Sequence, residues 1–88
     1  MNAEDRKKIA RALRQAADTL TIAEKKVLML YLGIDSEITM TAIEIAYIFR
    51  VEASHIEELI ESALQRLPND VRMLMISSMA VKERPEGN

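Results

Sequence analysis

Apolar side chains recur along this chain at the three- and four-residue spacing of amphipathic helices. The first such stretch runs from about Ala3 to Thr19. Its apolar positions form one stripe: Ile9, Leu13, Ala16, Ala17 and Leu20. Asn2 precedes this stretch as a suitable N-cap, and acids follow it in the first turn, where the helix dipole favours them. The pattern therefore predicts an N-terminal amphipathic helix.

Two capping boxes predict the starts of the next helices. Thr21 is followed three residues later by Glu24, and Thr41 is followed in the same way by Glu44. In each pair the two side chains satisfy backbone amides that a helix start leaves free. The helix that begins after Thr21 is expected to end at Gly33, because Gly adopts the left-handed C′ conformation easily. Residues 34–40 are expected to form a connecting loop.

The segment after Thr41 has the spacing of a helix-turn-helix. The first helix of this pair is expected to end near Phe49, and Arg50–Glu52 forms the turn. The second helix is expected to run to Leu67, because Pro68 stops it. Its start is open between a weak cap at Glu52 and a competing box at Ser54. The apolar anchors of the pair are Ile45, Ala46, Phe49, Val51, Ile56, Leu59 and Ile60.

A fifth helix is expected from roughly Val71 to Val81, capped by Asn69 or Asp70. Its apolar residues wrap much of its circumference: Val71, Met73, Leu74, Met75, Ile76, Met79 and Val81. One interpretation is that this helix packs back over a small core. The other is that Met75 and Met79 contact a partner or a second copy, because Met-rich faces adapt to varied partners. Residues 82–88 are expected to be a polar tail.

Composition agrees with a single small all-α domain of about five helices. Of the 88 residues, 49% are hydrophobic but only three are aromatic, and Gly and Pro occur twice each. The chain has no Cys and one His, which excludes disulfides and metal sites made of Cys or several His. No signal peptide or membrane-spanning run is expected, so the predicted location is the cytoplasm. We expect no enzyme, no cofactor and no small-molecule substrate.

Charge is distributed unevenly along the chain. The formal net charge is −2, whereas proteins that bind DNA on their own are usually basic. Cations concentrate in residues 1–20, and acids concentrate in residues 52–67, where Glu57, Glu58 and Glu61 share a helix. These three acids form a solvated face or contact a basic surface of a partner. A divalent cation site is a weaker alternative, because such sites normally draw ligands from a loop as well.

The segment 20–67 resembles region 4 of bacterial primary-type sigma factors. That family has a Leu-Thr-x-x-Glu-x-x-Val-Leu helix, a Gly-Ile-Asp loop, a Thr-x-x-Glu-Ile helix and a helix ending Ala-Leu-x-x-Leu. The matching residues are Leu20, Thr21, Glu24, Val27, Leu28, Gly33, Ile34, Asp35, Thr41, Glu44, Ile45, Ala46, Phe49, Val51, Ile56, Ala63, Leu64 and Leu67. The resemblance implies a helix-turn-helix domain at 20–67. The residue pattern adds an extra basic helix before it at 1–19 and an extra Met-rich helix after it at 68–81.

The departures from that family lie where its members read DNA. Positions that carry base-reading Arg, Glu or Gln there are Ala53, Ser54, His55, Glu57 and Glu58 in this chain, and a basic position has become Ser62. Arg and Lys make the commonest specific contacts to guanine, which none of these residues can make. The remaining candidates for DNA contact are Arg50, Ser54, His55, Arg66, Lys7 and Arg11.

The resemblance also implies a protein partner. Region 4 of sigma factors docks on RNA polymerase through an apolar surface of its first helices, which corresponds here to Val27, Leu28 and Tyr31. We therefore expect a small transcription-associated regulator that acts mainly by protein contacts, with RNA polymerase or another transcription protein as its partner. One alternative is a DNA-binding repressor or activator. The other is an adaptor that forms a homodimer and has no role in transcription.

Overall fold

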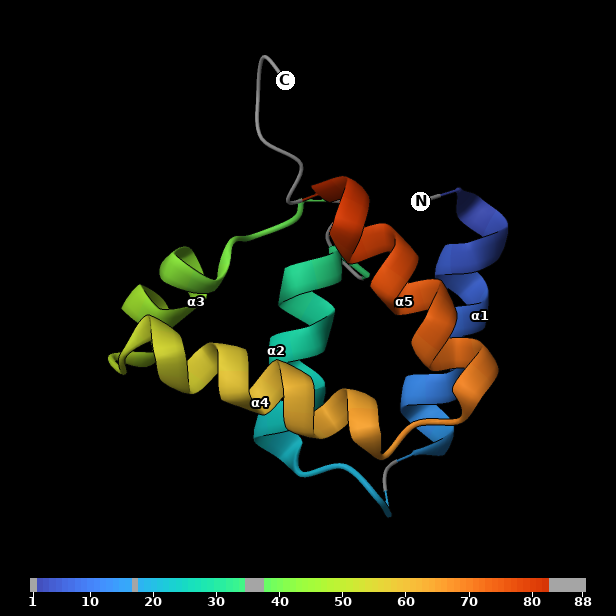
Figure 1. The fold of residues 1–88 in the computed structure, drawn as a ribbon, viewed down its shortest axis with the longest axis horizontal. Coiled ribbons are helices and arrows are strands. Elements are labelled where there is room, and N and C mark those ends of the chain that lie inside the picture. Colours follow the sequence, from blue (N-terminus) through green and yellow to red (C-terminus); the bar gives the residue numbers. More distant parts are fainter. Residues whose placement is uncertain (1, 17, 35–37, 83–88) are drawn as a thin grey trace.

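The computed structural model of the chain consists of five α-helices, and the residues that it describes contain no β-strand (Figure 1). It describes residues 2–16, 18–34 and 38–82, with side chains as far as Ser78. The helices are α1 (Ala3–Gln15), α2 (Ile22–Leu32), α3 (Ala42–Phe49), α4 (Ala53–Gln65) and α5 (Asn69–Lys82). The predicted all-α fold of five helices is therefore confirmed.

The predicted caps at the first three helix starts are present. The Asn2 side chain accepts a hydrogen bond of 2.7 Å from the Asp5 amide. Both capping boxes form as the sequence indicates, with Thr21 and Glu24 opening α2 and Thr41 and Glu44 opening α3. Each box satisfies two amides that would otherwise lack a partner, which defines where these helices begin.

Helix α1 ends earlier than predicted. Its C-cap is Ala16, although the sequence pattern suggests a helix that continues to Thr19. The backbone amides of Thr19 and Leu20 both donate to the Ala16 carbonyl at 2.9 Å. The Thr19 hydroxyl donates to the same carbonyl at 3.0 Å. This turn satisfies the end of the helix and directs Leu20 into the core, where it is buried as predicted. Ala17 of the predicted stripe lies outside the described residues.

Helix α2 ends at Gly33, as predicted. Gly33 has a φ of 66°, and a Cβ atom there would lie 3.0 Å from the backbone oxygen of Ile38. The guanidinium of Arg6 donates a hydrogen bond to the Gly33 carbonyl. This contact joins α1 to the end of α2 and places a cation at the negative end of the α2 dipole. A side chain at position 33 would disturb both the turn and the approach of Ile38.

The turn between α3 and α4 depends on a left-handed residue that is not Gly. Arg50 has a φ of 61°, and the following amide of Val51 donates to the Ala46 carbonyl at 3.0 Å. Helix α4 begins after Glu52, which makes no side-chain cap, so the competing start at Ser54 is wrong. Because the backbone carbonyl of Glu52 accepts from the amides of the next turn, the helix starts there without a side-chain cap.

The predicted boundary between α4 and α5 is wrong by a few residues. Helix α4 ends at Gln65 rather than Leu67, and α5 starts at Asn69. The Pro68 carbonyl accepts from the Arg72 amide at 2.9 Å, so neither Asn69 nor Asp70 is the cap of α5. Proline suits this role because the carbonyl of a cap residue takes part in the helix while its missing amide is not needed.

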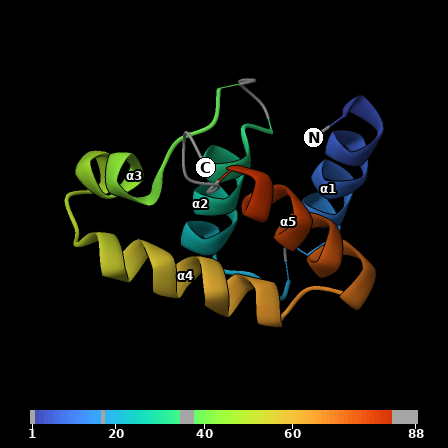
Figure 2. The same cartoon turned by 45° about the horizontal axis from the view of Figure 1, so that its top comes forward.

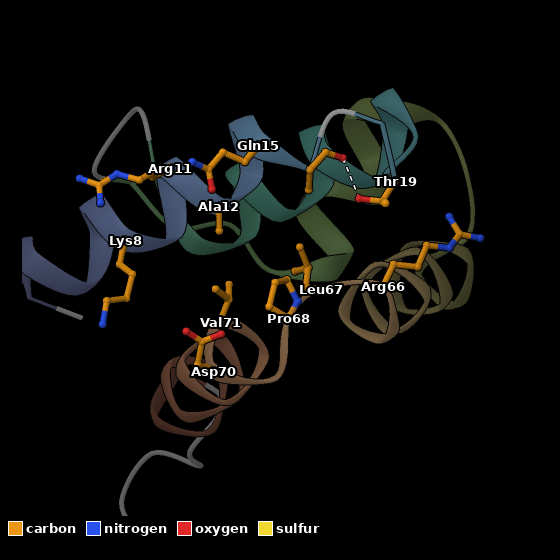
Figure 3. A pocket seen from close by; sticks show the side chains of 11 residues that line it. Lys8, Arg11, Ala12, Gln15, Thr19, Arg66, Leu67, Pro68, Asp70 and Val71 are labelled. Carbon is orange, nitrogen blue, oxygen red and sulfur yellow. Dashed lines mark hydrogen bonds between the residues drawn. The ribbon is translucent and has the colours of Figure 1, made fainter.

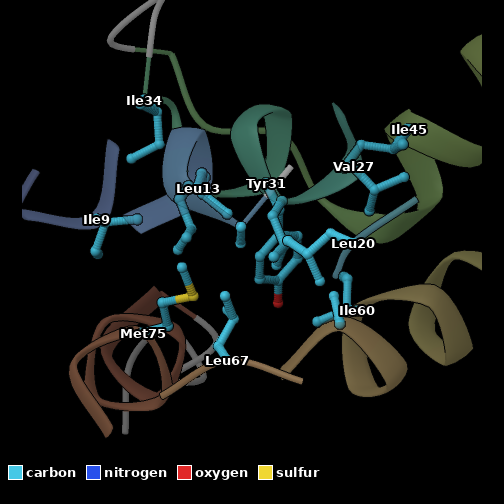
Figure 4. Packing of buried hydrophobic residues seen from close by; sticks show 14 of the residues in the cluster. Ile9, Leu13, Leu20, Val27, Tyr31, Ile34, Ile45, Ile60, Leu67 and Met75 are labelled. Carbon is cyan, nitrogen blue, oxygen red and sulfur yellow. The ribbon is translucent and has the colours of Figure 1, made fainter. Parts of the chain in front are cut away.

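Helix α2 lies in the middle of the molecule, with α3 on one side and α1 and α5 on the other, and α4 crosses α2 from the α3 side toward α5 (Figures 1 and 2). Packing is closest between α3 and α4, between α2 and α4, and between α1 and α5. A single core joins all five helices, and Figure 4 shows Met75 of α5 beside Leu13 of α1 and near Leu67. No helix among the described residues is long and apolar enough to cross a membrane.

Most of the predicted anchors of the α3–α4 pair are buried. Ile45, Ala46, Ile56 and Ile60 lie in the core, and Phe49 and Leu59 are half-buried. Val51 is the exception, with 39% of its surface exposed. It lies in the turn, beyond the end of α3 and before the start of α4, so neither helix orients it toward the core.

The left-handed backbone at Arg50 leads to a first prediction. A residue with a Cβ pays about 1–2 kcal/mol to adopt this conformation, and Gly avoids that cost. Gly also loses more backbone entropy on folding, which offsets part of the gain. The variant Arg50→Gly should therefore raise the free energy of unfolding by about 0.5–1 kcal/mol. Urea denaturation followed by circular dichroism measures this change. An unchanged or lower stability would contradict the conformation described for the turn.

The opposite change at Gly33 should be destabilising. The variant Gly33→Ala places a Cβ on a left-handed backbone and 3.0 Å from the Ile38 oxygen. We expect a loss of about 1–2 kcal/mol or more in the same denaturation experiment. Lys26→Ala provides the control, because Lys26 is exposed on the same helix. It should change the stability by less than about 0.5 kcal/mol.

Candidate protein-interaction surface

A buried carboxylate connects the two helices that position the candidate surface. Glu24 in the first turn of α2 is only 3% exposed. One of its oxygens, Oε1, accepts from the Thr21 amide at 2.9 Å and from the Arg66 guanidinium at 2.8 Å. The other oxygen, Oε2, accepts from the Ser62 hydroxyl at 2.8 Å and from the same guanidinium nitrogen at 3.0 Å. Glu24 thus caps its own helix and holds the last turns of α4 against it.

The surroundings of Glu24 keep it ionised. Burial of the carboxylate acts to raise its pKa, but hydrogen bonds from Thr21 and Ser62 and the positive charge of Arg66 outweigh this effect. The pKa of Glu24 is therefore lowered from its ordinary value. At neutral pH the folded chain holds a charged carboxylate here, and Arg66 balances it.

This network accounts for two positions that the sequence linked to DNA. Ser62 stands where the sigma family has a basic residue, and its hydroxyl points inward to Glu24. Arg66, a candidate for DNA contact, forms an ion pair of 2.8 Å with the same carboxylate. Its side chain is 48% exposed, yet its charge is already balanced inside the protein. Arg66 is therefore better explained as a structural residue than as a phosphate contact.

The other candidates for DNA contact do not form one surface. Arg50, Ser54 and His55 are exposed at the α3–α4 turn and in the first turn of α4. His55 Nδ1 lies 4.0 Å from the Glu58 carboxylate, so an acid is its nearest ionic neighbour. Lys7 and Arg11 are exposed on α1, which lies beyond α2 on the far side of the molecule (Figures 1 and 2). The turn and α1 therefore belong to different faces.

A groove runs between α1 and the junction of α4 with α5. It has a volume of about 620 Å³ and is lined along α1 by Lys8, Arg11 and Gln15 (Figure 3). Asp70 lies on its α5 side, and Arg66 lies at one end. The groove therefore carries charges of both signs and has an apolar floor, which does not resemble a continuous track for a phosphate backbone.

Four of the residues expected to contact a partner are buried instead. The exposed fraction is 0% for Val27, Leu28 and Met75 and 3% for Tyr31. Helix α2 packs mainly on α4 and also on α3 and α5, and Figure 4 shows Val27 beside Ile45 of α3, so the three α2 side chains belong to the core. The interpretation that the fifth helix packs back over the core therefore holds for Met75. The side chain of Met79 lies outside the described residues.

The acidic residues of α4 are on the surface, as the sequence suggests. Glu57, Glu58 and Glu61 are all exposed. Within the described part of the chain, no three His, Cys, Asp or Glu side chains are grouped closely enough to hold a metal ion. All three acidic side chains are therefore in contact with solvent.

An exposed apolar surface on α3 is the feature that sequence reasoning missed. Ile43 is 72% exposed, Tyr47 86%, Ile48 56% and Val51 39%. We call these four residues the apolar α3 face. The spacing contained a signal, because Ile43 and Tyr47 lie four residues apart and out of phase with the buried Ile45. The pattern predicts Ile45, Ala46 and Phe49 of this helix as core anchors and assigns no role to Ile43, Tyr47 and Ile48.

Comparison with known proteins found no matching family model, no matching curated protein and no matching solved structure. The functional argument therefore depends on the chain's own residues, and above all on the surface of α3 and α4.

The Glu24 network predicts a pH-dependent contribution to stability. Because the folded pKa lies below 4.5, the charged carboxylate stabilises the fold at neutral pH, and this contribution is lost as the pH falls below 4.5. Glu24→Gln should lower the free energy of unfolding by about 1–3 kcal/mol at pH 7. The difference between the variant and the natural chain should shrink in acid, measured by urea denaturation at several pH values. A difference that stays constant with pH would mean that the charge of Glu24 does not stabilise the fold.

Proposed function

We propose that this chain is a small transcription-associated regulator that acts through protein contacts rather than by reading DNA. The proposal has two parts. The choice of protein over DNA comes from the surface of α3 and α4. The association with transcription comes from the resemblance to sigma region 4, which implies RNA polymerase or a protein bound to it as the partner.

The charge of the α3–α4 surface carries the first part. Residues 41–61 contain five Glu and a single Arg. DNA-binding surfaces gain most of their non-specific affinity by neutralising phosphates with Lys and Arg, and this segment has the opposite sign. Glu57, Glu58 and Glu61 are exposed and would face the phosphates directly. A helix with this charge is repelled by a DNA groove and attracted to a basic surface.

The second part, the association with transcription, depends on how the α3–α4 pair matches sigma region 4. Helices α3 and α4 pack against each other across a three-residue turn, and their shared core contains Ile45, Ala46 and Ile56. These positions match the sigma region 4 pattern, while the outward positions depart from it. A chain that keeps the inner residues of this motif and changes the outer ones supports a role in which the shape is used by a protein partner.

One observation favours the DNA-binding alternative. The exposed cations Lys7, Lys8, Arg11 and Arg14 give α1 a basic surface that phosphates would attract. In that case α1, and not α4, would supply the contacts to DNA.

The adaptor alternative is supported by two exposed apolar side chains on α5. Met73 is 58% exposed and Ile76 is 44% exposed, so both are accessible to a second copy or another protein.

Titration of a labelled random-sequence duplex with the full chain tests the first part. We expect no saturable binding, measured by fluorescence anisotropy at low and at physiological salt, because α4 repels the phosphates. The triple variant Glu57→Lys, Glu58→Lys and Glu61→Lys raises the formal net charge from −2 to +4 and should gain salt-sensitive binding. Binding by the natural chain that falls with salt and is lost in Lys7→Gln with Arg11→Gln would establish the alternative instead.

The second part needs a separate experiment. Tagged full-length chain should co-purify with core RNA polymerase after nuclease treatment, which removes bridging nucleic acid. The triple Lys variant is compared in the same experiment. Loss of polymerase from this variant would show that Glu57, Glu58 and Glu61 take part in the contact. Absence of polymerase from the purified natural chain would overturn this part of the proposal without affecting the first.

A further inference from the structure

The apolar α3 face combines three features that are uncommon together on a water-exposed helix. Its side chains are large, they are close in sequence, and two of them are more than 70% exposed, namely Ile43 and Tyr47. The described part of the chain packs nothing over them. Clustered exposed apolar residues often mark a site of protein contact, and Tyr is among the residues that contribute most at interfaces. This face is therefore the best-formed candidate for a binding surface.

The surroundings of this face are acidic. Glu44 is exposed on the same helix, and Glu52 follows Val51 directly and is exposed as well. Arg50 is the one cation in residues 41–61. Glu52 makes no side-chain cap, so it is free to contact a partner. Charge complementarity therefore requires an occupant that carries cations beside its apolar side chains.

The same charges argue against a second copy of this chain. In a symmetric dimer the same patch from both copies would meet across a two-fold axis. Such a contact would bring the acidic residues around both apolar α3 faces together, and like charges oppose association. A partner with basic residues gains the apolar contact without this repulsion.

The dimensions of α3 indicate the form of the partner. The helix has eight residues, which corresponds to a length of about 12 Å. Two turns of a partner helix, from its position i to i+7, extend about 10.5 Å. Apolar side chains at i, i+3 or i+4 and i+7 would therefore match the length of the apolar α3 face.

We propose that the apolar α3 face binds a cationic amphipathic helix of another protein. The partner contributes an apolar stripe at helical spacing that contacts Ile43 and Tyr47, and flanking Lys or Arg residues that meet Glu44 and Glu52. This inference builds on the proposed function, because it identifies the chemistry of the protein partner. It does not depend on the partner's being part of RNA polymerase.

Three labelled peptides of equal length test the proposal against the full chain by fluorescence anisotropy. The first has Leu at i, i+3, i+4 and i+7 and Lys at the remaining positions, the second has Glu in place of Lys, and the third has Ala in place of Leu. We expect saturable binding of the Leu–Lys peptide only, with at least about tenfold weaker binding of the other two, equivalent to at least about 1.4 kcal/mol.

Two variants locate the binding. Ile43→Ser with Tyr47→Ser removes the centre of the apolar α3 face and should weaken binding of the Leu–Lys peptide at least tenfold. Both side chains are largely exposed, so the variant should remain folded, which circular dichroism verifies. Ile22→Ser is the matched control, because Ile22 is 86% exposed at the start of α2, away from α3. It should bind the peptide as the natural chain does.

Several outcomes would overturn the proposal. Equal binding by the Ile43→Ser, Tyr47→Ser variant would show that the peptide contacts another surface. Equal binding of the Leu–Glu peptide would show that cations on the partner do not contribute to binding. Failure of the Leu–Lys peptide to bind would show that the face does not bind a cationic amphipathic helix. A dimer in light scattering that this double variant abolishes would mean that a second copy occupies the face. None of these results alters the duplex titration, which tests the proposed function separately.

Discussion

The buried carboxylate of Glu24 determines how the two halves of this molecule fit together. Its hydrogen bond to the Thr21 amide helps to define the start of α2, and its contacts with Ser62 and Arg66 hold the end of α4. Because α3 packs chiefly on α4, the position of the whole α3–α4 pair follows from this contact. A buried charge is tolerable only when it is balanced and fully hydrogen-bonded, so all four groups depend on one another.

The other side of α2 is occupied by the chain itself. Helices α1 and α5 pack together there, and Met75 is buried in the core. Arg6 of α1 donates a hydrogen bond to the Gly33 carbonyl at the end of α2. A core of this size in a chain of 88 residues needs such coverage, because the second half of α2, from Val27 to Leu32, is apolar on all sides. The surfaces that the described residues offer to a partner are the outer sides of α3 and α4, the basic side of α1 and the side of α5 that exposes Met73 and Ile76.

The sequence predicted the parts of the fold that depend on local chemistry. The boxes at Thr21 and Thr41 and the left-handed Gly33 each involve contacts within a few residues, and each was predicted correctly. The α4–α5 boundary was not, because the carbonyl of Pro68 begins α5 without any side-chain signal. The roles of buried Tyr31 and paired Arg66 depend on helices far away in the sequence, so spacing alone could not assign them.

The surface of α3 was missed for a related reason. An amphipathic pattern identifies the buried side of a helix when the opposite side is polar. Helix α3 has apolar side chains on both its inner and outer sides, so the pattern cannot tell which of them are buried. The packing of Ile45 and Ala46 decides the matter, since their burial leaves Ile43 and Tyr47 facing outward. The inner residues are constrained by the core, whereas the outer ones contribute little to folding. Large apolar side chains at positions that the fold does not require are best explained by contact with something outside the chain.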